Sequence, residues 1–179
     1  MITQDQLGIL IAKNSYGAKE EDVCTALNIS MGEFNIDTPL RTAMYLAQIL
    51  HETGGFNYFC ELGKPAYFSK YEGRTDLGNT EKGDGYKFRG RGFIQITGRF
   101  NYAKAGKALG LDFIGSPDLA AELIPGARIA GWFWQTRNLN PPSERRDITR
   151  VTRIINGGLN GLNDRMKWYQ KAKAVLVIT

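Results

Sequence analysis

Two glutamates, Glu52 and Glu61, stand nine positions apart at the ends of the segment ETGGFNYFCE. Two carboxyl groups facing each other across a cleft are the arrangement that hydrolyses a glycosidic bond, with one of them acting as general acid. The glycines and aromatic residues between them favour a compact, half-buried loop. The alternative is a pair of ordinary surface glutamates, and the spacing alone does not decide between the two.

Glu52 lies where a helix is expected to end. The triplet DTP at positions 37–39 predicts the start of this helix, with Thr38 as N-cap and the proline at the first helical position. Gly54 and Gly55 predict its end. Because carbonyl dipoles at a helix C-terminus disfavour negative charge, this position favours the protonated side chain that a general acid needs.

A second set of polar residues follows in YKFRGRGFIQITG, residues 86–98. The alternation of apolar and polar residues predicts a short strand with a glycine-rich lead-in. Gln95 and Thr97 would then share one face, where an amide and a hydroxyl can position a substrate and a water. A solvated strand face is the competing interpretation.

Three more polar side chains are candidates for substrate binding. Asn101 and Tyr102 stand at the start of the next predicted helix, where capping is the alternative explanation. Asn156 precedes two glycines, so it either ends a helix in the left-handed conformation or lines a groove.

Other kinds of chemistry have few residues to support them. His51 is the only histidine, so a serine hydrolase would depend on it, and a histidine-rich zinc site is excluded. Cys24 and Cys60 do not form a disulfide framework and are read as small buried hydrophobic residues. We expect neither a metal ion nor another cofactor.

The formal charge of +5 and the pI of about 9.2 favour anionic partners, such as nucleic acid, a membrane surface or an acidic cell-wall polymer. A merely basic soluble protein is the alternative. The tract KFRGRGF has the composition of single-stranded nucleic-acid binders, but it occurs once and continues into an apolar strand. We therefore expect no nucleic-acid partner.

The remaining pattern predicts a single domain over residues 1–179. It is mainly α-helical with one small β element, of the α+β class, and no linker separates a cell-wall-binding domain. A capping box at Thr3 and Gln6 begins the first helix, which fades near 14–15. Further helices are predicted at 19–28, 99–109, from 116 with an interruption at 125–126, from 127, over 148–155 and over 163–176.

Three stretches resemble the signature motifs of glycoside hydrolase family 19, which contains chitinases and phage endolysins. They are HETGGF at 51–56, FRGRGFIQITGRFNY at 88–102 and RIINGG at 153–158, in the order of the family. The resemblance covers roughly residues 38–165 and implies a two-lobed, lysozyme-like fold with the β element lining the cleft.

The resemblance also implies roles for individual residues. Glu52 would be the general acid, Glu61 the general base, and Thr97 the residue that helps to hold the attacking water. His51 would support the acid helix. The substrate-binding residues would be Gln95, Asn101, Tyr102 and Asn156.

The chain departs from plant chitinases in having a compact loop between the glutamates and only two cysteines, and Phe100 stands where the family often has tyrosine. These departures favour peptidoglycan as the substrate. We expect an endolysin that hydrolyses β-1,4-glycosidic bonds by inversion. A chitinase is the alternative enzyme, and an inactive carbohydrate-binding domain is the alternative of another class.

The expected partners are peptidoglycan strands and the anionic surface of a cell wall or outer membrane. No apolar run approaches the roughly 20 residues of a membrane span, so stable membrane insertion is not expected. The first residues lack the pattern of a secretory signal. We expect a monomer that accumulates in the host cytoplasm and reaches the wall once the membrane is breached.

Overall fold

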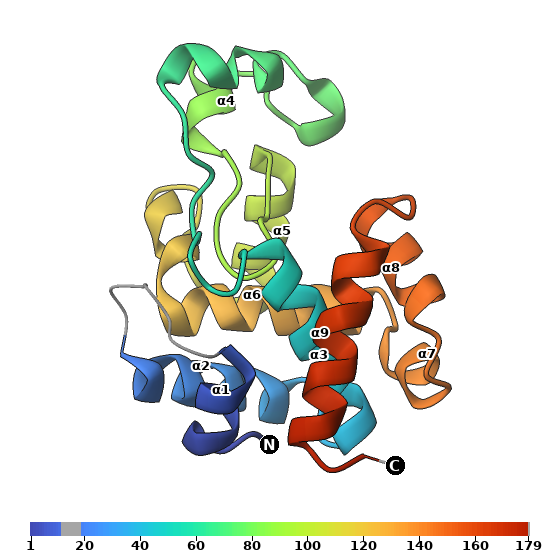
Figure 1. Cartoon of the computed structure of the whole chain (residues 1–179). Coiled ribbons are helices and arrows are strands. Elements are labelled where there is room, and N and C mark those ends of the chain that lie inside the picture. Colours follow the sequence, from blue (N-terminus) through green and yellow to red (C-terminus); the bar gives the residue numbers. More distant parts are fainter. Residues whose placement is uncertain (12–18, 179) are drawn as a thin grey trace.

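The computed structural model describes residues 1–11 and 19–178, and the helices form a larger lower part beneath a smaller upper part (Figure 1). The upper part contains η1 (Pro65–Tyr71), η2 (Thr75–Leu77) and α4 (Asp84–Lys87), and α5 (Arg99–Leu109) lies below it. The lower part consists of α1 (Gln4–Ile11), α2 (Glu20–Glu33), α3 (Pro39–Glu52), η3 (Pro117–Ala121), α6 (Leu123–Thr136), α7 (Asn140–Glu144), α8 (Ile148–Asn156) and α9 (Leu162–Val175). The prediction of a mainly helical, lysozyme-like fold is confirmed.

Helix α3 is the centre of the lower part. The Thr38 side chain accepts a hydrogen bond from the Arg41 N–H at 3.2 Å, and Pro39 is the first helical residue, as predicted. Residues 42–50 are all buried, because α9 packs along α3 and other helices surround it. A helix that is buried all round must belong to the core. The core therefore fixes the end of α3, where Glu52 lies.

Several predicted boundaries agree with the structure. The Thr3 N–H donates to Gln6 Oε1 at 3.0 Å and the Gln6 N–H donates to Thr3 Oγ1 at 3.1 Å, which is a capping box. The predicted end of this helix near 14–15 lies outside the described residues. Helix α5 has the predicted bounds and ends at Gly110, which is in the left-handed conformation.

Other boundaries need correction. Pro125 and Gly126 do not interrupt a helix but lie in the first turn of α6, where the missing N–H of a proline costs nothing. Helix α2 continues to Glu33, beyond the predicted end at 28. Helix α9 has Gly161 as N-cap, and no side chain caps it. The sequence pattern did not predict η1, η2, α4 or α7.

The predicted strand within 86–98 is wrong. Among the described residues this segment makes only isolated bridges, from Arg91 to Cys60 and to Ile96. Gly92 and Gln95 have φ angles of +74° and +52°, so the chain turns back on itself instead of extending. A Cβ on Gly92 would lie 2.5 Å from the carbonyl oxygen of residue 120, which explains why this turn requires glycine. The β element is therefore minor, and it forms a tight loop.

An ion pair joins α5 to the upper part. Arg99 donates to the Asp84 carboxylate from Nε at 2.8 Å and from Nη2 at 2.7 Å, and only 2% of the Asp84 side chain is exposed. The guanidinium of Arg99 holds the pKa of Asp84 below its usual range. In η1, the buried ring of Phe68 packs against neighbouring tyrosines.

Within the described part of the chain, no helix combines the length and the apolar character needed to cross a bilayer.

Candidate active site

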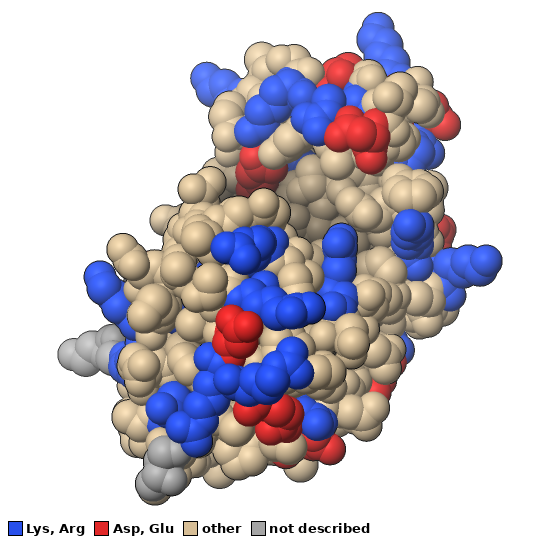
Figure 2. Space-filling view, turned by 90° about the vertical axis from the view of Figure 1, so that its right-hand side faces the viewer, with Lys and Arg blue, Asp and Glu red and all other residues tan. Residues whose placement is uncertain are grey.

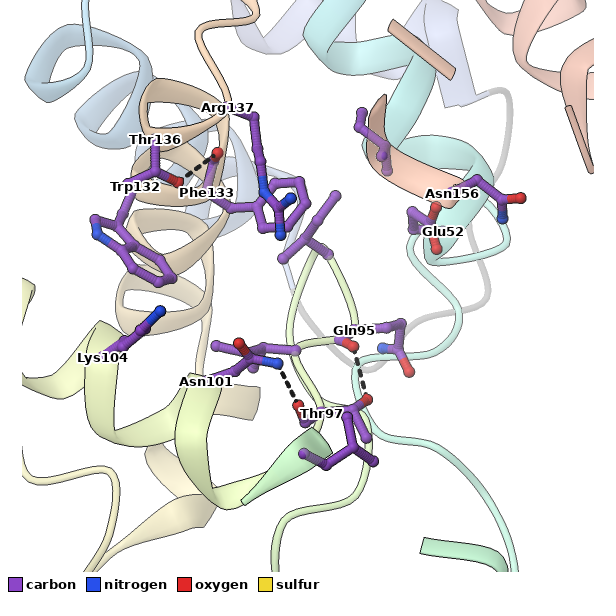
Figure 3. Close-up of a pocket in the computed structure, with 14 residues that line it drawn as sticks. Glu52, Gln95, Thr97, Asn101, Lys104, Trp132, Phe133, Thr136, Arg137 and Asn156 are labelled. Carbon is purple, nitrogen blue, oxygen red and sulfur yellow. Dashed lines mark hydrogen bonds between the residues drawn. The ribbon is translucent and has the colours of Figure 1, made fainter. Parts of the chain in front are cut away.

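A cavity of about 690 Å³ opens between the two parts of the molecule. Figure 2 shows the hollow between the upper part and the body below, and Figure 3 shows the residues that line it. The volume is within the range of small-molecule sites. The lining consists of Glu52, Leu77, Ile94, Gln95, Ile96, Thr97, Asn101, Lys104, Trp132, Phe133, Thr136, Arg137, Ile155 and Asn156.

Glu52 reaches this cavity from the last position of α3. Arg165 on α9 donates from Nη2 to Glu52 Oε1 and from Nη1 to Gln48 Oε1, the latter at 2.7 Å. The Arg165 side chain is fully buried, whereas 21% of the Glu52 side chain is exposed. The carboxylate is thus held from behind and open on the cavity side. The residue pattern at the helix end does not reveal this buried cation beside Glu52.

His51 joins the end of α3 to α9 and does not line the cavity. Its Nδ1 lies 2.7 Å from Asp164 Oδ2. The ring packs directly on Gly161, where a Cβ would lie 2.3 Å from His51 Nε2. Asp164 lies in the first turn of α9 and pairs with the histidine. This placement suits the structural role that the resemblance implies for His51.

The wall that faces Glu52 carries three of the predicted residues. Thr97 Oγ1 donates to the Gln95 carbonyl at 3.0 Å, and Asn101 Nδ2 donates to the Thr97 carbonyl at 2.7 Å. Gln95 Nε2 donates to the Gly92 carbonyl at 3.0 Å. These bonds hold the three side chains in place, and Figure 3 shows those of Thr97 and Asn101. The Thr97 hydroxyl oxygen remains able to accept a hydrogen bond.

Asn156 and Tyr102 have different places. Asn156 is the last residue of α8, before the left-handed Gly157, and it also lines the cavity close to Glu52 (Figure 3). Gly157, and not Asn156, adopts the left-handed conformation that ends the helix, so the interpretation of Asn156 as a left-handed helix end is wrong and its place in the cavity lining agrees with the other interpretation. Tyr102 is only 1% exposed, and its hydroxyl donates to the Arg89 carbonyl at 2.7 Å. Burial raises the pKa of Tyr102 to about 12. We correct its placement among the substrate-binding residues, because it has no surface for a sugar.

Glu61 lies beside this cavity and does not belong to its lining. Its Oε1 accepts from Lys70 Nζ at 3.1 Å and from the Tyr71 hydroxyl at 3.2 Å. Gly90 lies between Glu61 and Gln95. A Cβ on Gly90 would lie 3.3 Å from Glu61 Oε2 and 3.0 Å from Gln95 Oε1. The absence of a side chain at Gly90 thus lets the carboxylate approach the amide of Gln95. Burial, together with the charge of Glu61, raises the pKa of Tyr71.

Sequence reasoning missed several residues around the cavity. Lys104, Trp132 and Arg137 line it without belonging to any motif considered above. The sequence could have indicated that Arg165 is buried, because it lies on the same helix face of α9 as the buried Tyr169. An arginine on an apolar helix face needs a buried acceptor. The position of that acceptor, Glu52, required the three-dimensional fold.

No group of three or more His, Cys, Asp or Glu side chains within 1–11 and 19–178 could hold a metal ion. The carboxyl groups of Glu52, in the cavity, and Glu61, beside it, can transfer protons. Amides and a hydroxyl beside them can bind sugars and orient a water.

Comparisons with known proteins agree with this geometry. The family model described as chitinase class I, of glycoside hydrolase family 19, matches residues 32–153. A glycosyl hydrolase family 19 domain-containing protein of Haemophilus influenzae is 39% identical over 73% of this chain and 78% of its own length. A basic endochitinase of Vitis vinifera is 29% identical over 76% of this chain, which spans 55% of that plant protein.

Solved structures give the same fold. Chitinase C from Streptomyces griseus has a TM-score of 0.78 at 23% identity and covers 99% of this chain and 77% of its own. A bacterial family 19 chitinase has a TM-score of 0.75 at 24% identity, with 99% and 95% of the two chains covered. At these identities the structures show the fold alone. The family match and the bacterial relative show more: the chain belongs to glycoside hydrolase family 19, a family of chitinase-like glycosidases.

Proposed function

We propose that this protein hydrolyses the β-1,4-glycosidic bonds of bacterial peptidoglycan with inversion of the anomeric carbon. The observation that carries the proposal is the placement of Glu52 in a cavity whose facing wall presents Gln95, Thr97 and Asn101. Glu52 is the proposed general acid. Gln95, Asn101 and Asn156 are the proposed sugar-binding residues.

Glu61 is the proposed general base. Hydrogen bonds from Lys70 and from the Tyr71 hydroxyl hold its carboxylate in place beside the cavity. Thr97 is proposed to hold the attacking water, since its hydroxyl oxygen can accept a hydrogen bond. Inversion requires room for this water, and the two carboxyl groups of inverting enzymes stand about 6.5–9.5 Å apart. Proton donation by Glu52 to the leaving oxygen then completes the cleavage.

Chitin is a second candidate substrate. Several related plant proteins are named endochitinases, and the bacterial structures of the same fold are named chitinases. The cavity residues proposed to bind an N-acetylated sugar serve both polymers, because the two share β-1,4-linked N-acetylhexosamines. The endolysin role is favoured by the basic charge of the chain, which suits an anionic wall.

For the role in the cell, we propose a monomeric lysis enzyme. It would be held in the host cytoplasm and act on the wall after the membrane is permeabilised. Its partners would be glycan strands and an anionic wall or outer-membrane surface.

The experiment compares two purified substrates. We expect release of reducing ends from purified peptidoglycan, unchanged by EDTA, at a higher kcat/KM than from soluble chitin oligosaccharides. NMR of the first product should show the α anomer before mutarotation. Activity on chitin alone would show that the substrate is chitin and not peptidoglycan. A β product would exclude the inverting mechanism. No activity on either substrate would favour a binding domain.

A further inference from the structure

Two cationic side chains line the cavity on the wall across from Glu52. Lys104 comes from the middle of α5, and Arg137 follows the last residue of α6. Figure 3 shows both beside Trp132 and Phe133 and separated from Glu52 by the hollow. Neither the family motifs nor the proposed acid–base chemistry uses these two cations.

Within the described residues, no ion pair includes Lys104 or Arg137. Lys104 Nζ lies 4.1 Å from the centroid of the Phe100 ring, and the Arg137 guanidinium carbon lies 4.8 Å from that of Phe133. Such contacts orient a cation without neutralising it. The negative end of α6 explains a cation at Arg137, but it does not explain Lys104 in the middle of α5. Two uncompensated charges in a concave site create a local attraction for anions.

The two candidate substrates differ in this property. Chitin is uncharged, whereas peptidoglycan carries peptide stems with carboxylate groups on alternate sugars. We propose that Lys104 and Arg137 bind a carboxylate of the peptide stem and thereby make the cavity selective for peptidoglycan over chitin. The proposal rests on glycan binding in this cavity, as the proposed function requires. Arg137 supplies the planar fork that pairs with a carboxylate, and Lys104 adds a second positive charge.

Trp132 gives the same wall an apolar surface beside Lys104. Its side chain is partly exposed, and an aromatic ring of this kind can pack against the apolar face of a sugar. The sugar ring would lie on Trp132, and the stem peptide would extend toward the charges. Both parts of the contact are therefore available on one wall.

The test measures binding by calorimetry in the Glu52→Gln background, which prevents turnover. The two probes are chitotetraose and a soluble muropeptide of two disaccharides with their stem peptides. We expect Lys104→Gln and Arg137→Gln each to weaken muropeptide binding about tenfold, as after loss of one hydrogen bond between charged groups. Chitotetraose binding should stay unchanged. Arg137→Lys should retain part of the affinity, because it keeps the charge and loses the fork.

Lys107→Gln is the matched control, since Lys107 is exposed on the same helix and does not line the cavity. Equal weakening of both probes, no change with either, or an equal effect of Lys107→Gln would overturn the proposal. Failure of the muropeptide to bind at all would also overturn it. The proposed function fails on a different result, namely an unaltered chain that releases nothing from purified peptidoglycan.

Discussion

At the scale of single residues, a buried guanidinium holds the carboxylate of Glu52. Arg165 bonds Gln48 and Glu52 at once, and its Nε has no partner among the described residues. Its position therefore depends strongly on these two acceptors, since an unpaired buried charge is costly. The carboxylate that we propose as the acid is also part of the contact between α3 and α9.

Replacing this carboxylate tests both roles. Glu52→Gln should reduce hydrolysis of peptidoglycan by at least about 100-fold, because an amide cannot deliver a proton. The variant should fold, but its free energy of unfolding should fall by about 1–3 kcal/mol, since Arg165 loses a charged acceptor. Turnover assays and urea denaturation measure the two effects. Activity within tenfold of the unaltered protein would contradict the acid assignment.

Thr97 permits a finer test. Thr97→Val keeps the shape of the side chain and removes the hydroxyl, so hydrolysis should slow by about 10- to 1000-fold, as after loss of one positioned hydrogen bond. Thr97→Ser should keep most of the rate. Thermal unfolding of both variants controls for the bond that Thr97 makes to the Gln95 carbonyl. An unchanged rate in the valine variant would leave Thr97 a purely structural part of the loop.

At the scale of elements, glycine sets the contact between α9 and the end of α3. Gly161 and Gly157 both have left-handed backbones, with φ of +76° and +78°. A Cβ on Gly161 would lie 2.3 Å from His51 Nε2, whereas a Cβ on Gly157 would meet nothing within 4 Å. A side chain at either position would strain the left-handed backbone, but only a side chain at Gly161 would also clash with His51.

Alanine at each position separates these effects. Gly157→Ala should cost about 1–2 kcal/mol of unfolding free energy, the cost of a left-handed alanine. Gly161→Ala should lower the free energy of unfolding by about 1–3 kcal/mol more than Gly157→Ala does, because His51 must move away from Asp164. Chemical denaturation of the two variants measures the difference. Equal losses would show that His51 adapts freely.

A second test concerns the attachment of the upper part. Asp84→Asn should lower the free energy of unfolding by about 3 kcal/mol, because Arg99 loses its nearly buried carboxylate. Asp76→Asn is the control: Asp76 pairs with Arg74 on the surface, where an ion pair contributes little. Denaturation at pH 7 compares the two. A similar loss in both variants would contradict the special role of Asp84.

The same pair predicts a dependence on pH. The pKa of Asp84 is lowered in the folded protein, so its contribution is complete above the unfolded-state pKa of about 4. It is lost as the pH falls below that value and through the folded-state pKa. The difference in stability between the unaltered protein and Asp84→Asn should therefore shrink on acidification from pH 5 to about pH 2.

The elements also show what could be predicted from the sequence. Local signals, such as Thr38 before a proline and the glycine after Leu109, gave the bounds of α3 and α5 because capping is a short-range effect. The strand over 86–98 failed because alternation does not reveal the close approach of Gly92 to α6 and η3. Five of the residues singled out from the family motifs line the cavity, namely Glu52, Gln95, Thr97, Asn101 and Asn156. The sequence did not predict Arg165 and Arg137 as part of the site, because the residues around them come from distant parts of the chain.

At the scale of the molecule, the charge is unevenly distributed. Residues 137–179 contain nine Lys and Arg against three Asp and Glu, whereas residues 1–136 contain fourteen against fifteen. Figure 2 looks onto the side where α7 and α8 lie and shows Lys and Arg gathered below the hollow. Arg150 and Arg153 are exposed and three positions apart, so they share the outer side of α8, while Val151 is buried. Arg145 is exposed at the end of α7.

This basic face should direct the protein to anionic surfaces. Replacing Arg145, Arg150 and Arg153 by glutamine should weaken binding to vesicles that contain anionic lipid by about 3 kcal/mol, at about 1 kcal/mol for each basic residue. The control removes the same charge elsewhere, by glutamine at the exposed Lys64, Lys82 and Lys107.

Vesicle sedimentation at two salt concentrations measures the effect. Binding of the unaltered protein should fall as salt rises, because screening shortens the reach of surface charges to about 8–10 Å near physiological ionic strength. The arginine variant should lose most of this salt-dependent binding, and the lysine variant should keep most of it. Turnover of soluble muropeptides should stay the same in both, since none of the six residues lines the cavity. Equal weakening of vesicle binding in the two variants would mean that net charge alone attracts the protein, and that the face over α7 and α8 has no special role.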